Sequence, residues 1–178
     1  TISGGEPLVQ VEFVRAILRG CKRLGLHTAL DTNGYLGSRA DDQFLADVDL
    51  VLLDIKEWNP EAYRKLTGVS LQPTLMFAER LARLGRPVWL RYVLVPSLTD
   101  NLDHITGLAA YAASLGNIER VDVLPFHKMG EYKWKKLGIP YTLTDTPSPN
   151  PEQVEIVRDV FRSHGLNVPA GKGMKLEA

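Results

Sequence analysis

The amino-acid sequence predicts an α/β protein built on parallel strands. Short apolar segments alternate with longer segments whose apolar residues recur every three or four positions, which is the pattern of strands joined by helical crossovers. The clearest strand, VDLVLLDI at residues 48–55, is almost continuously apolar, as expected where helices cover one face of a sheet and a packed interior fills the other. The 178 residues, 44% of them hydrophobic, suffice for a substantial core.

The first expected elements cover the amino-terminal third of the chain. Apolar content and turn residues predict strands over 1–3, 26–31 and 50–55, and helices over 12–24 and 41–46. In the helix over 12–24, one face collects apolar side chains that we expect to face the core: Phe13, Ile17, Leu18, Cys21 and Leu24. Gly25 follows as a helix terminator.

The same alternation continues to the carboxyl end. Helices are expected over 73–84, 102–115 and 151–164, and strands over 88–95, 120–125 and 166–168. Gly85 ends a helix, and Pro60 and Pro151 lie near helix starts. Residues 128–150 are polar and Pro-rich, so we expect a long loop that packs over the open end of the sheet. No internal repeat divides the chain, which predicts one domain over 1–178.

Composition excludes several classes of function. Twenty-one basic residues balance 21 acidic ones without a basic, aromatic-rich cluster, so nucleic acid is not an expected partner. The apolar runs are shorter than the roughly 20 residues of a membrane span, and no signal segment opens the chain, so a cytoplasmic location without membrane contact is expected. The single cysteine, Cys21, excludes an internal disulfide and any iron-sulfur cluster held wholly by this chain's thiolates.

Polar residues gather where the predicted strands end. Ligands of parallel α/β folds bind at the carboxyl ends of strands, where loops converge and helix N-termini offer free N–H groups. Five successive strands carry such residues at or near this end, namely Gly4, Gly5 and Glu6, then Asp31 to Gly34, then Asp54, Ile55 and Lys56, then Arg91, and finally His127. Their shared location favours a binding site.

Each of these residues also has a structural explanation when it is taken alone. The two glycines could simply form a tight turn without binding a ligand, and Asp31 could cap a helix or form an Asx turn. Asp54 and Lys56 are two residues apart on a strand, so a local ion pair is an alternative. Arg91 could simply neutralise one of the carboxylates, and His127 could be structural.

Together, the strand-end segments resemble a known family. The chain carries SGGEP, LDTNG, LDIK, VWLRYVLVP with a following TD, and LPFHKMGEYKW, in the order and at the spacing of the radical S-adenosylmethionine (SAM) enzymes that activate pyruvate formate-lyase. The resemblance covers essentially the whole chain. It implies a partial (β/α)6 TIM-like barrel and a [4Fe-4S] cluster on a CxxxCxxC loop, which is absent from this sequence.

The resemblance also implies roles for the strand-end residues. Gly4, Gly5 and Glu6 would receive the SAM amino group, and Arg91 would lie nearer the protein substrate. The remaining SAM contacts would come from Asp31, Asp54, Ile55, Lys56 and His127. A monovalent cation near the SAM carboxylate would be held by Asp31, Thr32 and Asp54, whose hard oxygen atoms suit such an ion.

The implied reaction is reductive cleavage of SAM, followed by abstraction of a hydrogen atom from a backbone glycine of pyruvate formate-lyase. A flavodoxin-like or ferredoxin-like reductant would supply the electron. Two alternatives stay open: activation of another glycyl-radical enzyme, and a non-catalytic ligand-binding α/β domain.

The opening segment suggests a fragment. The chain begins at what would be the second barrel strand, so we expect the carboxyl-terminal part of a longer protein that lacks the first βα unit, is inactive alone and binds SAM weakly or not at all. A missing first strand would leave the edge at residues 1–3 unpaired, which predicts self-association or fraying there.

Overall fold

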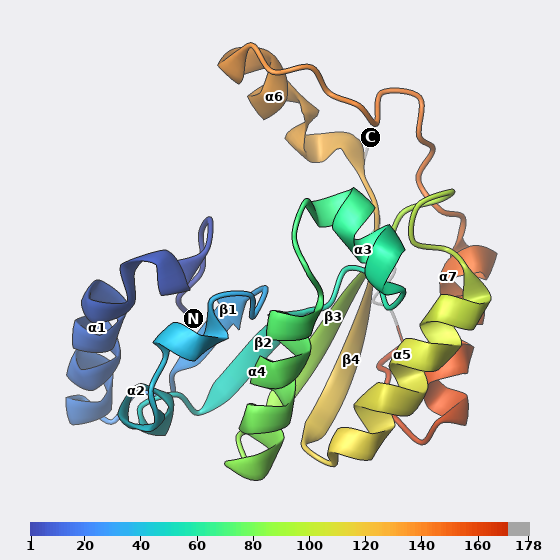
Figure 1. The fold of residues 1–178 in the computed structure, drawn as a ribbon. Helices are drawn as coiled ribbons and strands as arrows, with labels where there is room; N and C mark the ends of the chain where they lie inside the picture. The colour runs from blue at the N-terminus through green and yellow to red at the C-terminus, as the bar shows by residue number, and fades with distance from the viewer. Residues whose placement is uncertain (171–178) are drawn as a thin grey trace.

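A computed structural model shows four parallel strands in one sheet (Figure 1). The structure describes residues 1–170, so residues 171–178 of the expected domain lie outside this range. The strands are adjacent in chain order: β1 (Ala29–Thr32), β2 (Leu50–Asp54), β3 (Val88–Leu94) and β4 (Ile118–Pro125). Ile2 extends the sheet past β1 through a parallel bridge to Leu30. The parallel α/β prediction is confirmed.

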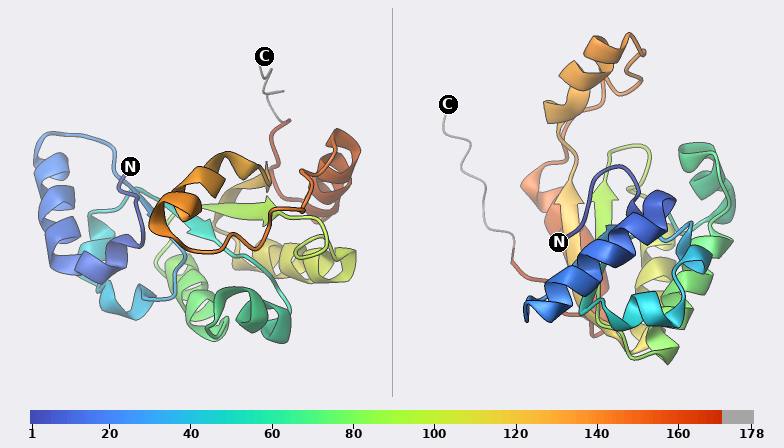
Figure 2. Two further views of the ribbon diagram at one scale, coloured as in Figure 1. Left: turned by 90° about the horizontal axis from the view of Figure 1, so that it is seen from above. Right: turned by 90° about the vertical axis from the view of Figure 1, so that its left-hand side faces the viewer.

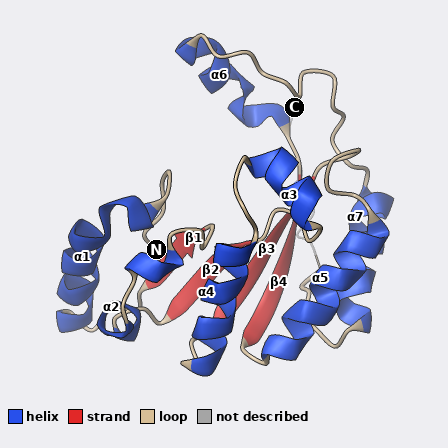
Figure 3. Cartoon of the chain, in the orientation of Figure 1, coloured by secondary structure: helices blue, strands red, loops and turns tan. Residues whose placement is uncertain are grey.

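Helices connect the strands, and those that contribute to the core pack on one face of the sheet (Figure 3). They are α1 (Val11–Arg23), α2 (Asp42–Ala46), α3 (Pro60–Thr67), α4 (Gln72–Arg83), α5 (Leu102–Leu115), α6 (Glu131–Leu137) and α7 (Pro151–Ser163), with 3-10 turns η1 (Pro7–Gln10), η2 (Gly37–Arg39) and η3 (Lys128–Gly130). Asparagine side chains cap three of these helices, α3, α5 and α7, by accepting hydrogen bonds from first-turn N–H groups. No helix within residues 1–170 is long and apolar enough to cross a membrane.

The two faces of the sheet differ. Along β3, Val88, Leu90, Tyr92 and Leu94 are buried, while the residues between them are partly exposed. The buried face belongs to one hydrophobic core with side chains of α1, α2, α4, α5 and α7. The other face, called the open face below, carries Asp31, Asp54, Trp89, Arg91, Arg120 and Asp122, each only partly buried. Because side chains alternate along a strand, one set builds the core and the other stays accessible.

Helix α1 was predicted within one residue, but its buried side was not. Phe13 and Leu24 are 63% and 76% exposed, whereas Val14 and Leu18 are buried. Val11, Val14 and Leu18 follow three- and four-residue spacing and form the stripe that meets the sheet. The expectation that Phe13, Ile17 and Leu24 face the core is therefore wrong, whereas Cys21 is half-buried.

Two predictions near the carboxyl end also need correction. No strand forms at 166–168. Asn167 meets β4 through two hydrogen bonds, one that its backbone oxygen accepts from Val121 N (2.9 Å) and one that its side-chain Nδ2 donates to Glu119 O (3.0 Å). Residues 128–150 contain η3 and α6 and are not a plain loop. This segment extends past the carboxyl ends of the strands (Figures 1 and 2), and none of residues 127–148 is buried, so it does not pack onto the sheet as expected.

Candidate functional site

The Gly4-Gly5-Glu6 loop is tied to the end of β1. The Glu6 carboxylate accepts hydrogen bonds from Thr32 Oγ1 (2.8 Å), Asn33 N (3.0 Å) and Leu8 N (3.1 Å). Gly4 and Gly5 have φ angles of 99° and 54°, a conformation that disfavours other residues. A Cβ on either glycine would meet no atom within 4 Å. The loop thus has an open backbone beside an anchored carboxylate.

Two carboxylates of the open face converge on one guanidinium. Arg91 donates from Nε to Asp54 Oδ1 at 2.7 Å and from its terminal nitrogen to Asp31. Lys56 Nζ lies 2.6 Å from the second Asp54 oxygen, and Ser3 Oγ donates to Asp31 at 2.8 Å. The two aspartates are only 16–17% exposed. This arrangement holds two partly buried negative charges together through cations.

Strand register produces this cluster. Asp54 lies opposite Arg91 in the pairing of β2 with β3, whereas Asp31 lies opposite Leu52, so the arginine reaches diagonally across β2. Two of the structural explanations considered from the sequence are present in the structure. Asp54 and Lys56 form an ion pair, and Arg91 neutralises the Asp54 carboxylate. Asp31 caps no described helix, and the Asx-type contact belongs to Asn33, which accepts from Tyr35 N at 2.9 Å.

Thr32 and Ile55 adjoin this cluster, whereas His127 lies five residues beyond Asp122, the residue of β4 that pairs with Arg91. Thr32 is buried, and its hydroxyl donates to Glu6 and accepts from Gly34 N at 3.0 Å. Ile55 is buried, and its N–H donates to Arg91 O at 3.3 Å. His127 is exposed just after β4. Within residues 1–170, no group of three or more His, Cys, Asp or Glu side chains is arranged to hold a metal ion.

Sequence reasoning missed two residues beside the site. Ser3, which donates to Asp31, directly precedes the two glycines. Glu57 directly follows Lys56 and is 1% exposed. Its carboxylate accepts from Trp58 N (2.6 Å) and Asn59 N (2.9 Å). The sequence does contain a signal for the role of Glu57. It is an acidic residue just before the helix start at Asn59-Pro60, where a carboxylate can accept hydrogen bonds from free N–H groups.

Comparison with known proteins defines the class first. Residues 1–109, over half of the chain, match the Radical SAM superfamily. The chain is therefore a member of this superfamily.

Curated relatives specify the family. The pyruvate formate-lyase 1-activating enzyme of Escherichia coli K12 is 42% identical over 171 residues, which cover 94% of this chain and 69% of the relative. The pyruvate formate-lyase-activating enzyme of Listeria monocytogenes is 40% identical over 169 residues, or 92% of this chain and 68% of the relative. This chain thus belongs to the pyruvate formate-lyase-activating enzymes.

Solved structures share the fold. A domain of pyruvate-formate lyase-activating enzyme from Bacteroides vulgatus superposes with a TM-score of 0.78 at 24% identity, covering 96% of both chains. Streptococcus suis SuiB bound to S-adenosylmethionine gives a TM-score of 0.69 at 19% identity and covers 94% of this chain and 38% of SuiB. The predicted partial barrel of the radical SAM fold is confirmed.

Membership of the superfamily implies S-adenosylmethionine and a [4Fe-4S] cluster. The donor set of the open face fits the first, because paired carboxylates suit a ligand that carries an ammonium group. It does not fit the second, because cluster iron needs several thiolates and the sequence has only Cys21, half-buried in α1. The residues of this chain can therefore contact S-adenosylmethionine but cannot by themselves hold the cluster.

Proposed function

We propose that this chain supplies the S-adenosylmethionine-binding face of an enzyme that activates pyruvate formate-lyase. The carrying observation is the convergence of Asp31 and Asp54 on one cation at the carboxyl end of the sheet. When bound, S-adenosylmethionine would supply the radical chemistry that takes a hydrogen atom from a glycine of the substrate protein. In this proposal, thiolates from outside these 178 residues hold the cluster, and a flavodoxin-like or ferredoxin-like protein supplies the electron.

The chain's own residues bind and orient the ligand. The open backbone of Gly4 and Gly5 admits the amino group, and Glu6 fixes this loop against β1. Lys56 presents a positive charge to the carboxylate of the methionyl group, and Asp54 presents a negative charge to its ammonium.

Three further contacts complete the proposed site. His127 approaches from the end of β4. Arg91, which holds both aspartates in the free chain, turns toward the protein substrate once a cation takes its place. Asp31, Thr32 and Asp54 hold that monovalent cation.

A chimaera tests this function. The matched segment of the Escherichia coli relative is replaced by this chain, and the glycyl radical formed on pyruvate formate-lyase is measured by electron paramagnetic resonance. Asp54→Ala and Lys56→Ala should each lower the activation rate about tenfold to a hundredfold, the factor for one charge-assisted hydrogen bond. Arg158→Ala, which removes a surface ion pair on α7, is the control and should leave the rate unchanged.

A chimaera that forms the radical equally well with Asp54→Ala would contradict the proposal. We also expect the isolated chain to bind S-adenosylmethionine weakly or not at all, because it lacks the cluster. Tight binding by the isolated chain that Asp54→Ala abolishes would refute this second expectation, but it would support the binding role of Asp54.

A further inference from the structure

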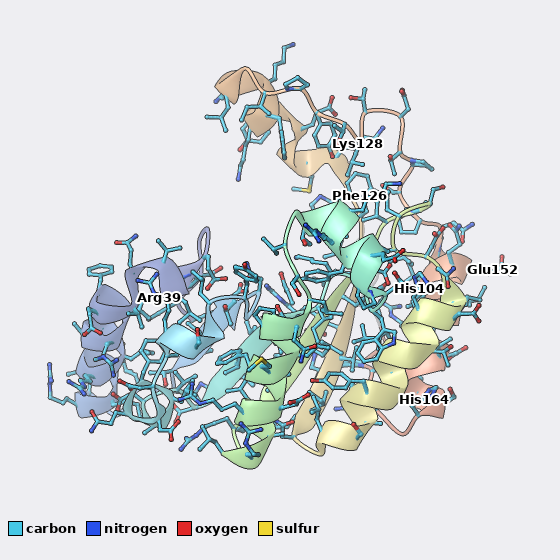
Figure 4. All side chains as sticks on the ribbon, in the orientation of Figure 1. Arg39, His104, Phe126, Lys128, Glu152 and His164 are labelled. Atoms are coloured by element: carbon cyan, nitrogen blue, oxygen red, sulfur yellow. The ribbon has the colours of Figure 1, made fainter. Side chains whose placement is uncertain are left out.

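Helix α5 presents three residues to the turn that follows β2. His104, Gly107 and Tyr111 are spaced by three and four positions, so they lie along one side of the helix. Opposite them are Glu57 and Trp58, which follow Lys56 in sequence. Figure 4 labels His104 on the first turn of α5, on the side of α3. Each of the three positions makes a different kind of contact with the turn.

The first contact joins two polar side chains. His104 Nδ1 lies 3.1 Å from Glu57 Oε1, although this buried nitrogen forms no hydrogen bond. That oxygen already accepts from Trp58 N and Asn59 N, and the second oxygen, Oε2, is buried with no hydrogen-bond partner. The pKa of Tyr92 is raised, mainly because its hydroxyl is buried and also because of the nearby negative charge of Glu57. A buried carboxylate with one oxygen unsatisfied is costly to keep, so its place in the turn calls for a reason beyond stability.

The second and third contacts are steric and aromatic. A Cβ built on Gly107 would lie 2.3 Å from Trp58 Nε1, so only glycine leaves room for the indole. Trp58 stacks on Tyr111 with ring centroids 5.0 Å apart, and Tyr111 Oη donates to Leu75 O of α4 at 3.1 Å. The indole is therefore held against α5, and Tyr111 is in turn tied to α4.

We propose that His104, Gly107 and Tyr111 of α5, acting through Glu57 and Trp58, hold the turn that sets Lys56 against Asp54. They are positioning residues, and their importance for activation rests on the proposed function of Lys56. The ammonium of Lys56 is 2.6 Å from Asp54, although its side chain is 34% exposed. Its own contacts therefore leave it partly free, whereas the next two residues are locked onto a helix.

The test measures the turn and the Lys56 amine separately in this chain. Glu57→Ala and Gly107→Ala should speed hydrogen exchange of the Trp58 and Asn59 amides about tenfold, the factor for losing a buried hydrogen bond. Acetylation of Lys56 by a water-soluble active ester, followed by mass spectrometry, should accelerate in parallel. Exchange in β2 and acetylation of Lys65 should not change. Glu57→Gln keeps one acceptor and should restore much of the slow exchange.

Matched variants guard against simple unfolding. Gly20→Ala is the control for Gly107→Ala, because Gly20 is also helical and a Cβ there meets nothing closer than 3.9 Å; it should leave the turn unchanged. His104→Ala removes a side chain that is 29% exposed and should speed exchange at Trp58 without loss of the fold. Unchanged acetylation of Lys56 in both Glu57→Ala and Gly107→Ala would overturn the proposal.

The chimaera separates this inference from the function on which it rests. If Lys56→Ala lowers radical formation, then Gly107→Ala should lower it too, and an unaffected Gly107→Ala would overturn the positioning role. If Lys56→Ala has no effect, the proposed role of Lys56 in activation fails. Faster acetylation of Lys56 in Gly107→Ala would in that case still support the positioning of the turn.

Discussion

The two faces of one sheet divide the work of this molecule. On β3, Leu90 is 1% exposed and packs in the core, while its neighbour Arg91 is 22% exposed and bridges two aspartates of the open face. Further along the open face, Arg120 stacks on Trp89, with its guanidinium carbon 4.5 Å from the ring centroid, and pairs with Asp122. Apolar burial thus specifies the fold on one face, whereas the other face carries the paired charges of the candidate site.

This division separates the energetics of the faces. Burying an aliphatic side chain contributes about 1.5 to 3 kcal/mol, whereas partly exposed ion pairs contribute little net stability because solvent screens them. Substitutions on the open face are therefore expected to alter binding more than folding, and the reverse is expected on the buried face.

The sharpest test of the comparison changes neighbouring residues on β3. Leu90→Ala should lower the free energy of unfolding by about 2 to 5 kcal/mol, because it leaves a cavity in a closed core. Trp89→Ala removes a larger but half-exposed ring and should cost less than Leu90→Ala. Urea unfolding followed by circular dichroism measures both, and a larger loss for Trp89→Ala would show that the open face is part of the core.

The next effect concerns the bridging arginine. Arg91→Met leaves the Asp31 and Asp54 carboxylates facing each other without their shared cation and should cost about 1 to 3 kcal/mol. Adding Asp31→Asn to Arg91→Met removes one of the two charges and should restore part of this stability. Unfolding of the single and double variants in urea gives the coupling. A double variant less stable than Arg91→Met would refute the charge-repulsion account.

The sequence predicted the strands better than it predicted which helix faces are buried. LDIK and LDTNG ended strands as expected because apolar runs and turn residues are local signals. Phe13, Ile17 and Leu24 were misplaced because the orientation of α1 depends on how it packs on the sheet, which periodicity alone does not fix. The diagonal contact of Arg91 with Asp31 depends on strand register and could not be predicted from the sequence. Glu57 was missed because its partner His104 is 47 positions away along the chain.

The smallest expected effect lies at the opposite, amino end of the sheet. Asp49 accepts from Lys22 Nζ (2.7 Å) and Thr28 N (2.8 Å), and these contacts hold its pKa at about 2. A carboxyl whose pKa is lower in the folded state stabilises the protein above its ordinary pKa, near 4, and loses this contribution as pH falls toward 2. Asp49→Asn should therefore melt slightly below the wild type at pH 7, and the difference should shrink between pH 4 and 2. A difference in melting temperature that does not change with pH would mean that Asp49 stabilises the protein through packing and not through its charge.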